Sequence, residues 1–157
     1  MSHAQLVLSY VAASALRGVI TALLIIGVGL VFTTVPIVHP LYMIAFLLVI
    51  AVLFSALGLI GGLWASDFDY LTVMNQFILR PLVFFGAVFY SLSVLPPLWR
   101  QVSLLNPMVY MVNGVRYGMV GVTEVPPNTS LLVLSAAAST VLLIDFLLIK
   151  RGYGITE

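Results

Sequence analysis

A long stretch without charge constrains the fold of this chain more than any other feature. Between Arg17 and Asp67 the sequence contains no Asp, Glu, Lys or Arg, and two prolines near its middle divide it into two apolar runs. An apolar run of about 20 residues is long enough to cross the hydrocarbon core of a bilayer as a helix. The sequence therefore predicts an all-α integral membrane protein, whose first two transmembrane helices span about 16–34 and 41–64.

The third crossing must contain both an arginine and a proline. The apolar segment from Pro81 to Leu95 is only about 22 Å long as a helix, which is shorter than the hydrocarbon core. We therefore expect the third transmembrane helix to span about 71–95, with Arg80 and Pro81 inside it and a kink at the proline. The fourth transmembrane helix spans about 130–149 and is followed by two basic residues, Lys150 and Arg151.

Between the last two crossings lies an apolar segment punctuated by prolines. Pro96 and Pro97 cannot donate backbone hydrogen bonds, so a helix that arrives there must end. Asn106 followed by Pro107 is typical of an N-cap and a first helical position, so a second short helix begins there. Each piece is too short to cross a bilayer, which predicts a re-entrant helical hairpin over 96–121. The predicted fold is thus four transmembrane helices with this hairpin between the third and the fourth.

Four crossings place both ends of the single membrane domain, 1–157, on the same side of the bilayer. The basic residues expected on that side are Arg17, Arg80, Lys150 and Arg151, and those expected on the other side are Arg100 and Arg116. Because cytoplasmic segments carry the excess of basic residues, this distribution favours cytoplasmic termini. The hairpin then opens toward the outside.

The segment 81–121 also carries a pattern of residue types at fixed spacing. It consists of Pro81, Gly86, Leu95, Pro96, Asn106, Pro107, Tyr110, Asn113, Gly114 and Arg116. This pattern resembles the signature of type-2 ABC transporter permeases, a family that exports drugs, lipids and polysaccharide precursors. The resemblance implies that the chain is the transmembrane permease subunit of an ATP-driven exporter.

The resemblance also implies partners and a location. Members of the family have six membrane helices per chain, work as two permease halves, and bind a separate ATPase through a coupling helix between the second and third helices. This sequence has room for four crossings, so Met1 would fall near the start of the third family helix. The expected partners are membrane lipid, an ABC ATPase that binds ATP and magnesium, and a second permease half, all in a bacterial inner membrane.

Composition and motifs argue against several other functions. The net charge is +1 and there is no basic run, which disfavours nucleic acid as a partner. The chain has no Walker loop, no cysteine and no clustered histidines, so we expect no cofactor, no metal site and no catalytic residues in it. The alternative to transport is a non-transporting membrane scaffold or assembly protein, or an inactive truncated remnant of a permease.

Two candidate sites involve the third crossing. Phe84, Phe85, Phe89 and Tyr90 form an aromatic band, and the corresponding helix lines the export path in the family that the chain resembles. For each of these residues, ordinary packing against lipid or helices is an equal alternative. Arg80 and Asp145 are the two charges expected within the bilayer, where they either form an ion pair or extend separately to the inner interface.

The remaining candidates lie in a turn and on the second hairpin helix. Asp67 and Asp69 lie on the cytoplasmic side, where they either contact the ATPase or form a solvated turn. Gly114 and Gly118 are four residues apart, a spacing that permits the close approach of another helix. Arg116, on the same helix, is expected to anchor it at the outer headgroup level.

Overall fold

The computed structural model describes residues 3–34, 36–65 and 67–152, and this part of the chain contains helices and turns but no β-strand. In chain order the elements are α1 (His3–Phe32), α2 (Pro40–Trp64), α3 (Phe68–Met74), the π-helix η1 (Asn75–Leu79), α4 (Arg80–Phe84), the 3-10 helix η2 (Leu92–Val94), α5 (Pro97–Ser103), α6 (Pro107–Val120) and α7 (Pro127–Lys150). The all-α prediction is confirmed. Among the described residues, α1, α2 and α7 are the helices long and apolar enough to cross a membrane.

Helices α2 and α7 lie close to the predicted second and fourth crossings, whereas the helix that contains the predicted first crossing extends further toward the N-terminus. Helix α1 begins at His3 rather than near residue 16, so Arg17 lies in the middle of a helix about 45 Å long, with its side chain exposed. No Gly or Pro precedes Arg17, and Ala, Leu and Arg all favour helix. Nothing in the sequence therefore stops the helix there.

The predicted third crossing is not one continuous helix. Helix α3 passes into η1 and then into α4, which ends at Phe84, well before the predicted end at residue 95. Pro81 lacks an N–H and its ring crowds the preceding turn, and the wider π turn just before it accommodates both effects. Beyond α4, Ala87 adopts a φ of 58° and the chain turns away. We call residues 68–84 the arm.

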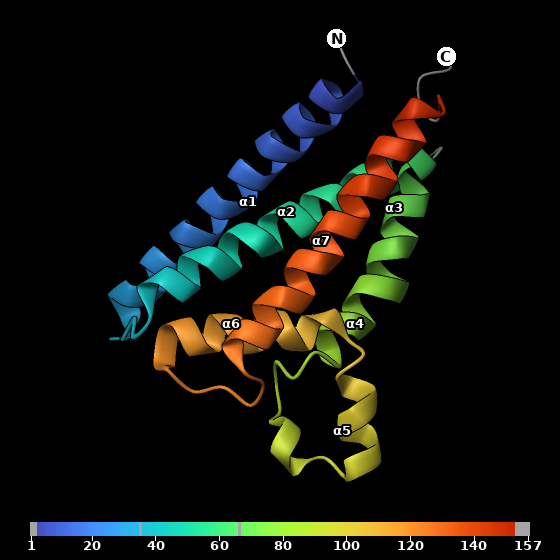
Figure 1. Cartoon of the computed structure of the whole chain (residues 1–157). Helices are drawn as coiled ribbons and strands as arrows, with labels where there is room; N and C mark the ends of the chain where they lie inside the picture. Colours follow the sequence, from blue (N-terminus) through green and yellow to red (C-terminus); the bar gives the residue numbers. More distant parts are fainter. Residues whose placement is uncertain (1–2, 35, 66, 153–157) are drawn as a thin grey trace.

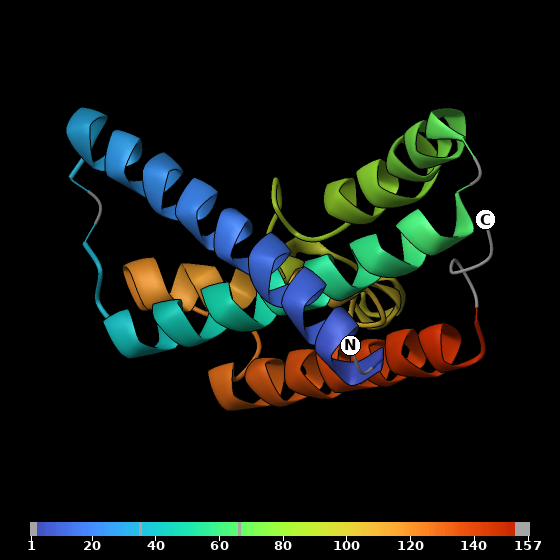
Figure 2. The ribbon, with the colours of Figure 1, turned by 90° about the horizontal axis from the view of Figure 1, so that it is seen from above.

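The elements form an open bundle around α2 (Figure 1). Helix α1 begins and α7 ends at the end of the molecule where α2 leads into α3, whereas α6 crosses the opposite ends of α2 and α7. Seen from above, α7 and the arm lie on opposite sides of α2, and α1 starts near α7, crosses α2 and diverges from the arm (Figure 2). Among the arm residues whose exposure is described, none is buried. The arm is therefore little covered by the rest of the chain.

The core consists of apolar side chains from α2, α6 and α7. Its buried members are Phe46, Leu53, Met108, Met111, Leu134 and Ala138. A second cluster brings in α1 and consists of Val7, Val11, Ala56, Leu59 and Ile149. Within each helix these residues recur at spacings of three, four or seven, as expected for one face of a helix.

Helices α5 and α6 occupy the segment predicted as a hairpin. Helix α6 begins at Pro107, as the sequence predicts, and α5 begins at Pro97, where the sequence predicted the end of the preceding helix. Helix α6 ends at Gly121, whose φ of 73° lies in the left-handed region that favours glycine. In Figure 1, α6 lies across the ends of the long helices and α5 lies beyond it.

Candidate functional site

Asn106 joins the end of the arm to the start of α6. Its side-chain oxygen accepts a hydrogen bond from the Met108 N–H at 2.9 Å, which caps the helix, and its Nδ2 donates to the Leu82 carbonyl at 2.8 Å. Pro107 occupies the first helical position, where no N–H is needed. A Cβ at Gly86 would lie 2.6 Å from the Met108 Cβ, so the chain after the arm approaches α6 too closely for a larger residue.

Two tyrosines fix the turns on either side of α5. The Tyr90 hydroxyl donates to the Phe85 carbonyl, and the Tyr110 hydroxyl donates to the Leu104 carbonyl, each at 2.8 Å. Leu95 packs half-buried against a small cluster whose buried members are Ala87, Leu92, Val109 and Val125. The exposed Pro96 precedes α5 as its N-cap residue. The motif residues therefore hold together the segment that connects the arm to α6.

Glycines allow α6 to lie directly on α2. A Cβ at Gly118 would be 2.7 Å from the Met43 Cβ and 2.9 Å from the Met43 Cα, so the two backbones are in contact there. A Cβ at Gly114 would overlap the ring of Phe46. The close helix contact expected from the spacing of these glycines is therefore present, and its partner is α2.

Glu124, in the loop between α6 and α7, is the centre of a polar network. Its carboxylate accepts hydrogen bonds from the Ser91 hydroxyl and from the Leu92 N–H, the latter at 2.7 Å. Its own N–H donates to Asn113 Oδ1 at 3.0 Å, and the buried Asn113 amide donates to the Val109 carbonyl at 2.9 Å. The network ties the loop before α7 both to η2 and to the interior face of α6.

Arg116 places a positive charge beside this network. Its guanidinium donates to the carbonyl of Ala87, the residue with positive φ, at 3.0 Å. Burial raises the pKa of Glu124, but the hydrogen bonds from Ser91 and from two backbone N–H groups, together with Arg116, outweigh burial and hold that pKa below its ordinary value. Arg116 is half-buried and ties α6 to the turn after the arm. Its anchoring at the headgroup level stays a prediction.

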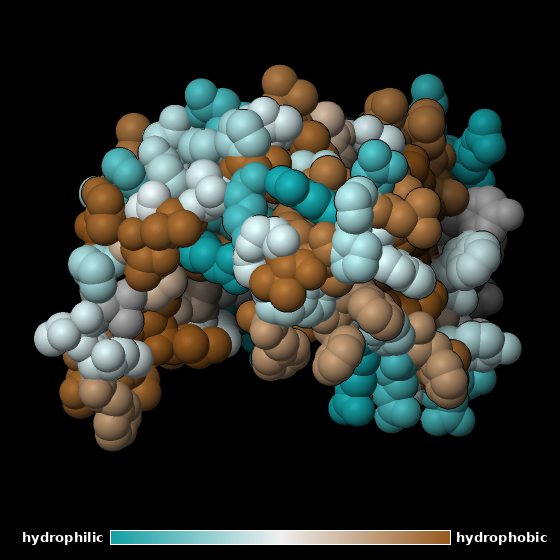
Figure 3. Space-filling model, turned by 90° about the horizontal axis from the view of Figure 1, so that it is seen from below, coloured by the Kyte–Doolittle hydropathy of each residue, from teal (hydrophilic) through white to brown (hydrophobic). Residues whose placement is uncertain are grey.

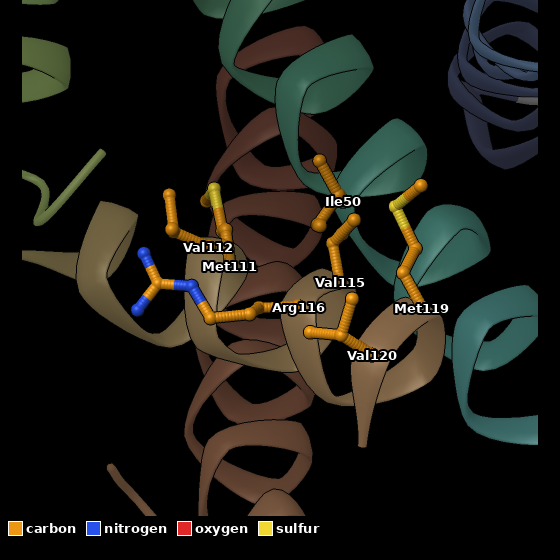
Figure 4. Close-up of a pocket in the computed structure, with 7 residues that line it drawn as sticks. All are labelled: Ile50, Met111, Val112, Val115, Arg116, Met119 and Val120. Carbon is orange, nitrogen blue, oxygen red and sulfur yellow. The ribbon is translucent and has the colours of Figure 1, made fainter. Parts of the chain in front are cut away.

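An apolar groove lies beside Arg116 on the joint surface of α2 and α6 (Figure 4). It has a volume of about 450 Å³ and is lined by Ile50, Met111, Val112, Val115, Arg116, Met119 and Val120. In the close-up, the guanidinium extends at one edge, whereas the apolar side chains gather where α6 meets α2. The groove faces the side of the molecule on which α1 and the arm diverge.

The aromatic band predicted for the third crossing is exposed for three of its four residues. Phe84, Phe85 and Phe89 are each more than 60% exposed. The Phe84 ring centroid lies 5.7 Å from that of Phe85 and 5.8 Å from that of Phe89. Tyr90 is half-buried, and its hydroxyl is directed at the Phe85 carbonyl. The structure therefore groups the three phenylalanines on one surface and leaves Tyr90 at its edge.

The ion pair that was one of the two alternatives for Arg80 and Asp145 is absent from the described part of the structure. Asp145 is completely buried, and neither of its carboxylate oxygens has a hydrogen-bond partner among the described residues. Arg80 is exposed on the arm. The two do not meet because α2 lies between the arm and α7 (Figure 2). Asp67 and Asp69 are exposed at the start of α3, with Asp67 at its N-cap position.

Comparison with known proteins identifies the family of this chain. The family model described as ABC-2 type transporter matches residues 1–120. The chain belongs to the ABC-2 type transporter family. The matched residues include the arm, the capped start of α6 and all the groove residues. The resemblance to type-2 ABC permeases is therefore confirmed, and it extends well beyond the 81–121 motif.

Individual relatives agree with this assignment. The chain is 41% identical over 151 residues to the "Inner membrane transport permease YadH" of Escherichia coli (strain K12) and, with the same figures, to that of Shigella flexneri. The matched region is 96% of this chain and 59% of those relatives, so the chain spans about three-fifths of their length. It is also 24% identical over 98 residues to "Nodulation protein J" of Rhizobium leguminosarum bv. viciae, which is 60% of this chain and 38% of that relative. No solved structure matches the chain.

Within this ABC-2 type chain, sequence analysis missed the polar network of Glu124 and Ser91. One signal was available, because Glu124 is the only acidic residue between Asp69 and Asp145. A single carboxylate in so apolar a sequence is expected to need donors close by. The identity of those donors was not visible, because Ser91 lies more than thirty residues away in the sequence.

Proposed function

We propose that this chain forms part of the transmembrane path of an ATP-driven exporter in a bacterial inner membrane, working with a second permease half and a separate ATPase. The observation that carries the proposal is the family match over residues 1–120, together with 41% identity to a transport permease. In this function the chain binds no cofactor itself, and the ATPase binds ATP and magnesium.

The proposal includes a topology with four crossings. The arm is about 25 Å long, which is at the lower limit for a helix that crosses the hydrocarbon core, and in this topology α1, α2, the arm and α7 each cross the bilayer. Helices α5 and α6 then form the re-entrant hairpin at the outer face, and both termini are cytoplasmic. The two basic residues that end α7, Lys150 and Arg151, support this orientation.

The substrate path lies along the arm. None of the arm residues with described exposure is buried, and Phe84, Phe85 and Phe89 form a continuous exposed aromatic surface at its end, bordered by Tyr90. A surface of this kind suits contact with a second permease half and with an apolar or amphipathic substrate between the halves. Asp67 and Asp69, exposed at the opposite end of the arm, would contact the ATPase.

Affinity purification from the native membrane tests the proposal. We expect a tagged chain to retain an ATPase subunit in stoichiometric amount. The double variant Asp67→Lys and Asp69→Lys should lose the ATPase, whereas Arg100→Glu, a charge reversal on α5 at the other end of the molecule, should keep it. Recovery of the chain with no ATPase would contradict the exporter and favour the non-transporting scaffold or the remnant.

A further inference from the structure

The arm carries a polar strip on an otherwise apolar surface. Thr72, Gln76 and Arg80 recur at intervals of four residues, and the π turn η1 includes Asn75 and Gln76. One cleft of about 340 Å³ is lined by Leu71, Thr72, Asn75, Gln76 and Arg80. In the view from below, hydrophilic side chains gather over the outer edge of the arm (Figure 3, lower right).

A second cleft continues this strip into the aromatic surface. It has a volume of about 330 Å³ and is lined by Asn75, Leu79, Arg80, Val83, Phe84 and Phe89. Asn75 and Arg80 belong to both clefts, so the two form one site with a polar half and an apolar half. Such a site matches a ligand that has a polar group attached to an apolar chain.

Arg80 determines the charge of that ligand. It lies about 18 Å along the arm from Phe68, which is near the middle of a hydrocarbon core of about 30 Å. An arginine at that depth is costly without a partner, and such residues mark substrate paths. Within residues 3–34, 36–65 and 67–152 no carboxylate pairs with the exposed Arg80. The partner is therefore expected to come from outside the described residues and to be an anion.

We propose that this site binds an anionic membrane lipid, with its phosphate on Arg80 and its acyl chain along Val83, Phe84 and Phe89. The planar guanidinium donates two parallel hydrogen bonds to a phosphate, and the Asn75 and Gln76 amides supply further donors beside it. The adjoining apolar cleft favours a lipid over a soluble anion. The inference deepens the proposed export function and rests on it for the lipid being cargo, but the binding is testable separately.

The test compares lipids retained by the intact chain. The protein is reconstituted in bilayers with equal amounts of phosphatidylglycerol and phosphatidylcholine, and native mass spectrometry counts the lipids that stay bound. We expect a roughly fivefold preference for phosphatidylglycerol, the factor typical of one basic residue facing an anionic lipid. Arg80→Gln should bring the ratio close to one, and Arg80→Lys should keep most of the preference.

Matched variants exclude other sources of the preference. Arg100→Gln removes an equally exposed arginine from α5, which is not one of the proposed crossings, and should leave the ratio unchanged. Phe89→Ala should weaken the retention of phosphatidylglycerol while circular dichroism shows an unaltered fold, because this ring is exposed. Soluble glycerol 3-phosphate should not compete.

Several results would overturn the inference. These are a wild-type ratio near one, an Arg80→Gln variant that keeps the wild-type ratio, and competition by glycerol 3-phosphate, which would mean a site for a soluble anion. The exporter proposal is tested separately, by whether an ATPase co-purifies with the chain. If phosphatidylglycerol is retained preferentially but no ATPase co-purifies, the lipid site is supported and the transport role is contradicted.

Discussion

Gly118 is the residue at which the position of α6 is most tightly fixed. Its missing side chain lets the α6 backbone touch the Met43 backbone, with a Cβ-to-Cα distance of 2.9 Å if a side chain were added. Backbone cannot move aside as the end of a flexible side chain can. Gly58 on α2 provides the contrast, because an added Cβ there meets nothing within 4 Å.

We therefore predict opposite effects for the same substitution at these two glycines. Gly118→Ala should destabilise the protein by about 1–3 kcal/mol, the usual range for overpacking a close contact. Gly58→Ala should be neutral or stabilising by up to about 1 kcal/mol, because alanine favours helix. Thermal unfolding in detergent measures both. Equal melting temperatures for the two variants would show that α6 and α2 do not meet as described.

Glu124 predicts a dependence of stability on pH. Its pKa is held below the ordinary value of 4.5, so the folded state favours the carboxylate. The stabilisation is therefore fully present above pH 4.5 and is lost as the pH falls through the lower folded pKa. Glu124→Gln should cost about 1 kcal/mol at neutral pH and should flatten the acid side of the stability profile.

Chemical unfolding between pH 3 and pH 7 measures this profile. Ser91→Ala removes one of the hydrogen bonds to the carboxylate and should reduce the acid dependence without abolishing it. An acid profile that is identical in the wild type and in Glu124→Gln would assign the dependence to another group.

Local and distant residue contacts differed in how well the sequence predicted them. The cap at Asn106 and the start of α6 at Pro107 depend on neighbours one or two positions away, and both are confirmed. The contact of Glu124 with Ser91 and the separation of Arg80 from Asp145 depend on where whole helices lie. A single sequence does not record that arrangement. The first contact was therefore missed, and for Arg80 and Asp145 an ion pair and separate extension to the inner interface both stayed open.

At the scale of elements, the arm departs most from its sequence prediction. The sequence predicted one helix over 71–95 with a kink at Pro81, because the apolar residues continue through Leu95 and the segment from Pro81 alone is too short to cross a bilayer. In the structure, a π turn precedes Pro81, and the chain turns away at Ala87, whose φ is positive. Composition thus predicted α2 and α7 well, because neither helix contains a proline after its first turn. Composition could not predict where the arm ends.

Pro81→Ala tests the origin of the π turn. The new N–H would be able to bond the carbonyl four residues earlier, so the arm should become a regular α-helix. Amide hydrogen exchange over residues 76–82 should slow by about fivefold to tenfold, the effect of one additional hydrogen bond. Pro97→Ala is the matched control, because Pro97 stands at the start of α5, where an N–H has no helical partner, and exchange there should not change.

At the scale of the whole molecule, the arm decides the topology. If it crosses the bilayer, Asp69 at its start and Gln101 on α5 lie on opposite sides of the membrane; if it does not, they lie on the same side. Both side chains are exposed, and the chain has no cysteine, so each position can carry a single cysteine for labelling. Labelling of these two positions therefore shows directly whether the chain crosses the bilayer between α2 and α5.

We predict that a membrane-impermeant maleimide labels Gln101→Cys in intact cells and labels Asp69→Cys only after permeabilisation. The physical reason is that Asp69 lies at the end of the bundle where α7 ends at Lys150 and Arg151, and basic residues stay on the cytoplasmic side. Phe46→Cys, fully buried in the core, should remain unlabelled in both conditions. The reverse pattern would invert the orientation, and labelling of both exposed positions from one side would mean that the arm returns without crossing. In that last case Arg80 would not lie at mid-membrane depth, and the cost of its charge could no longer select an anionic lipid.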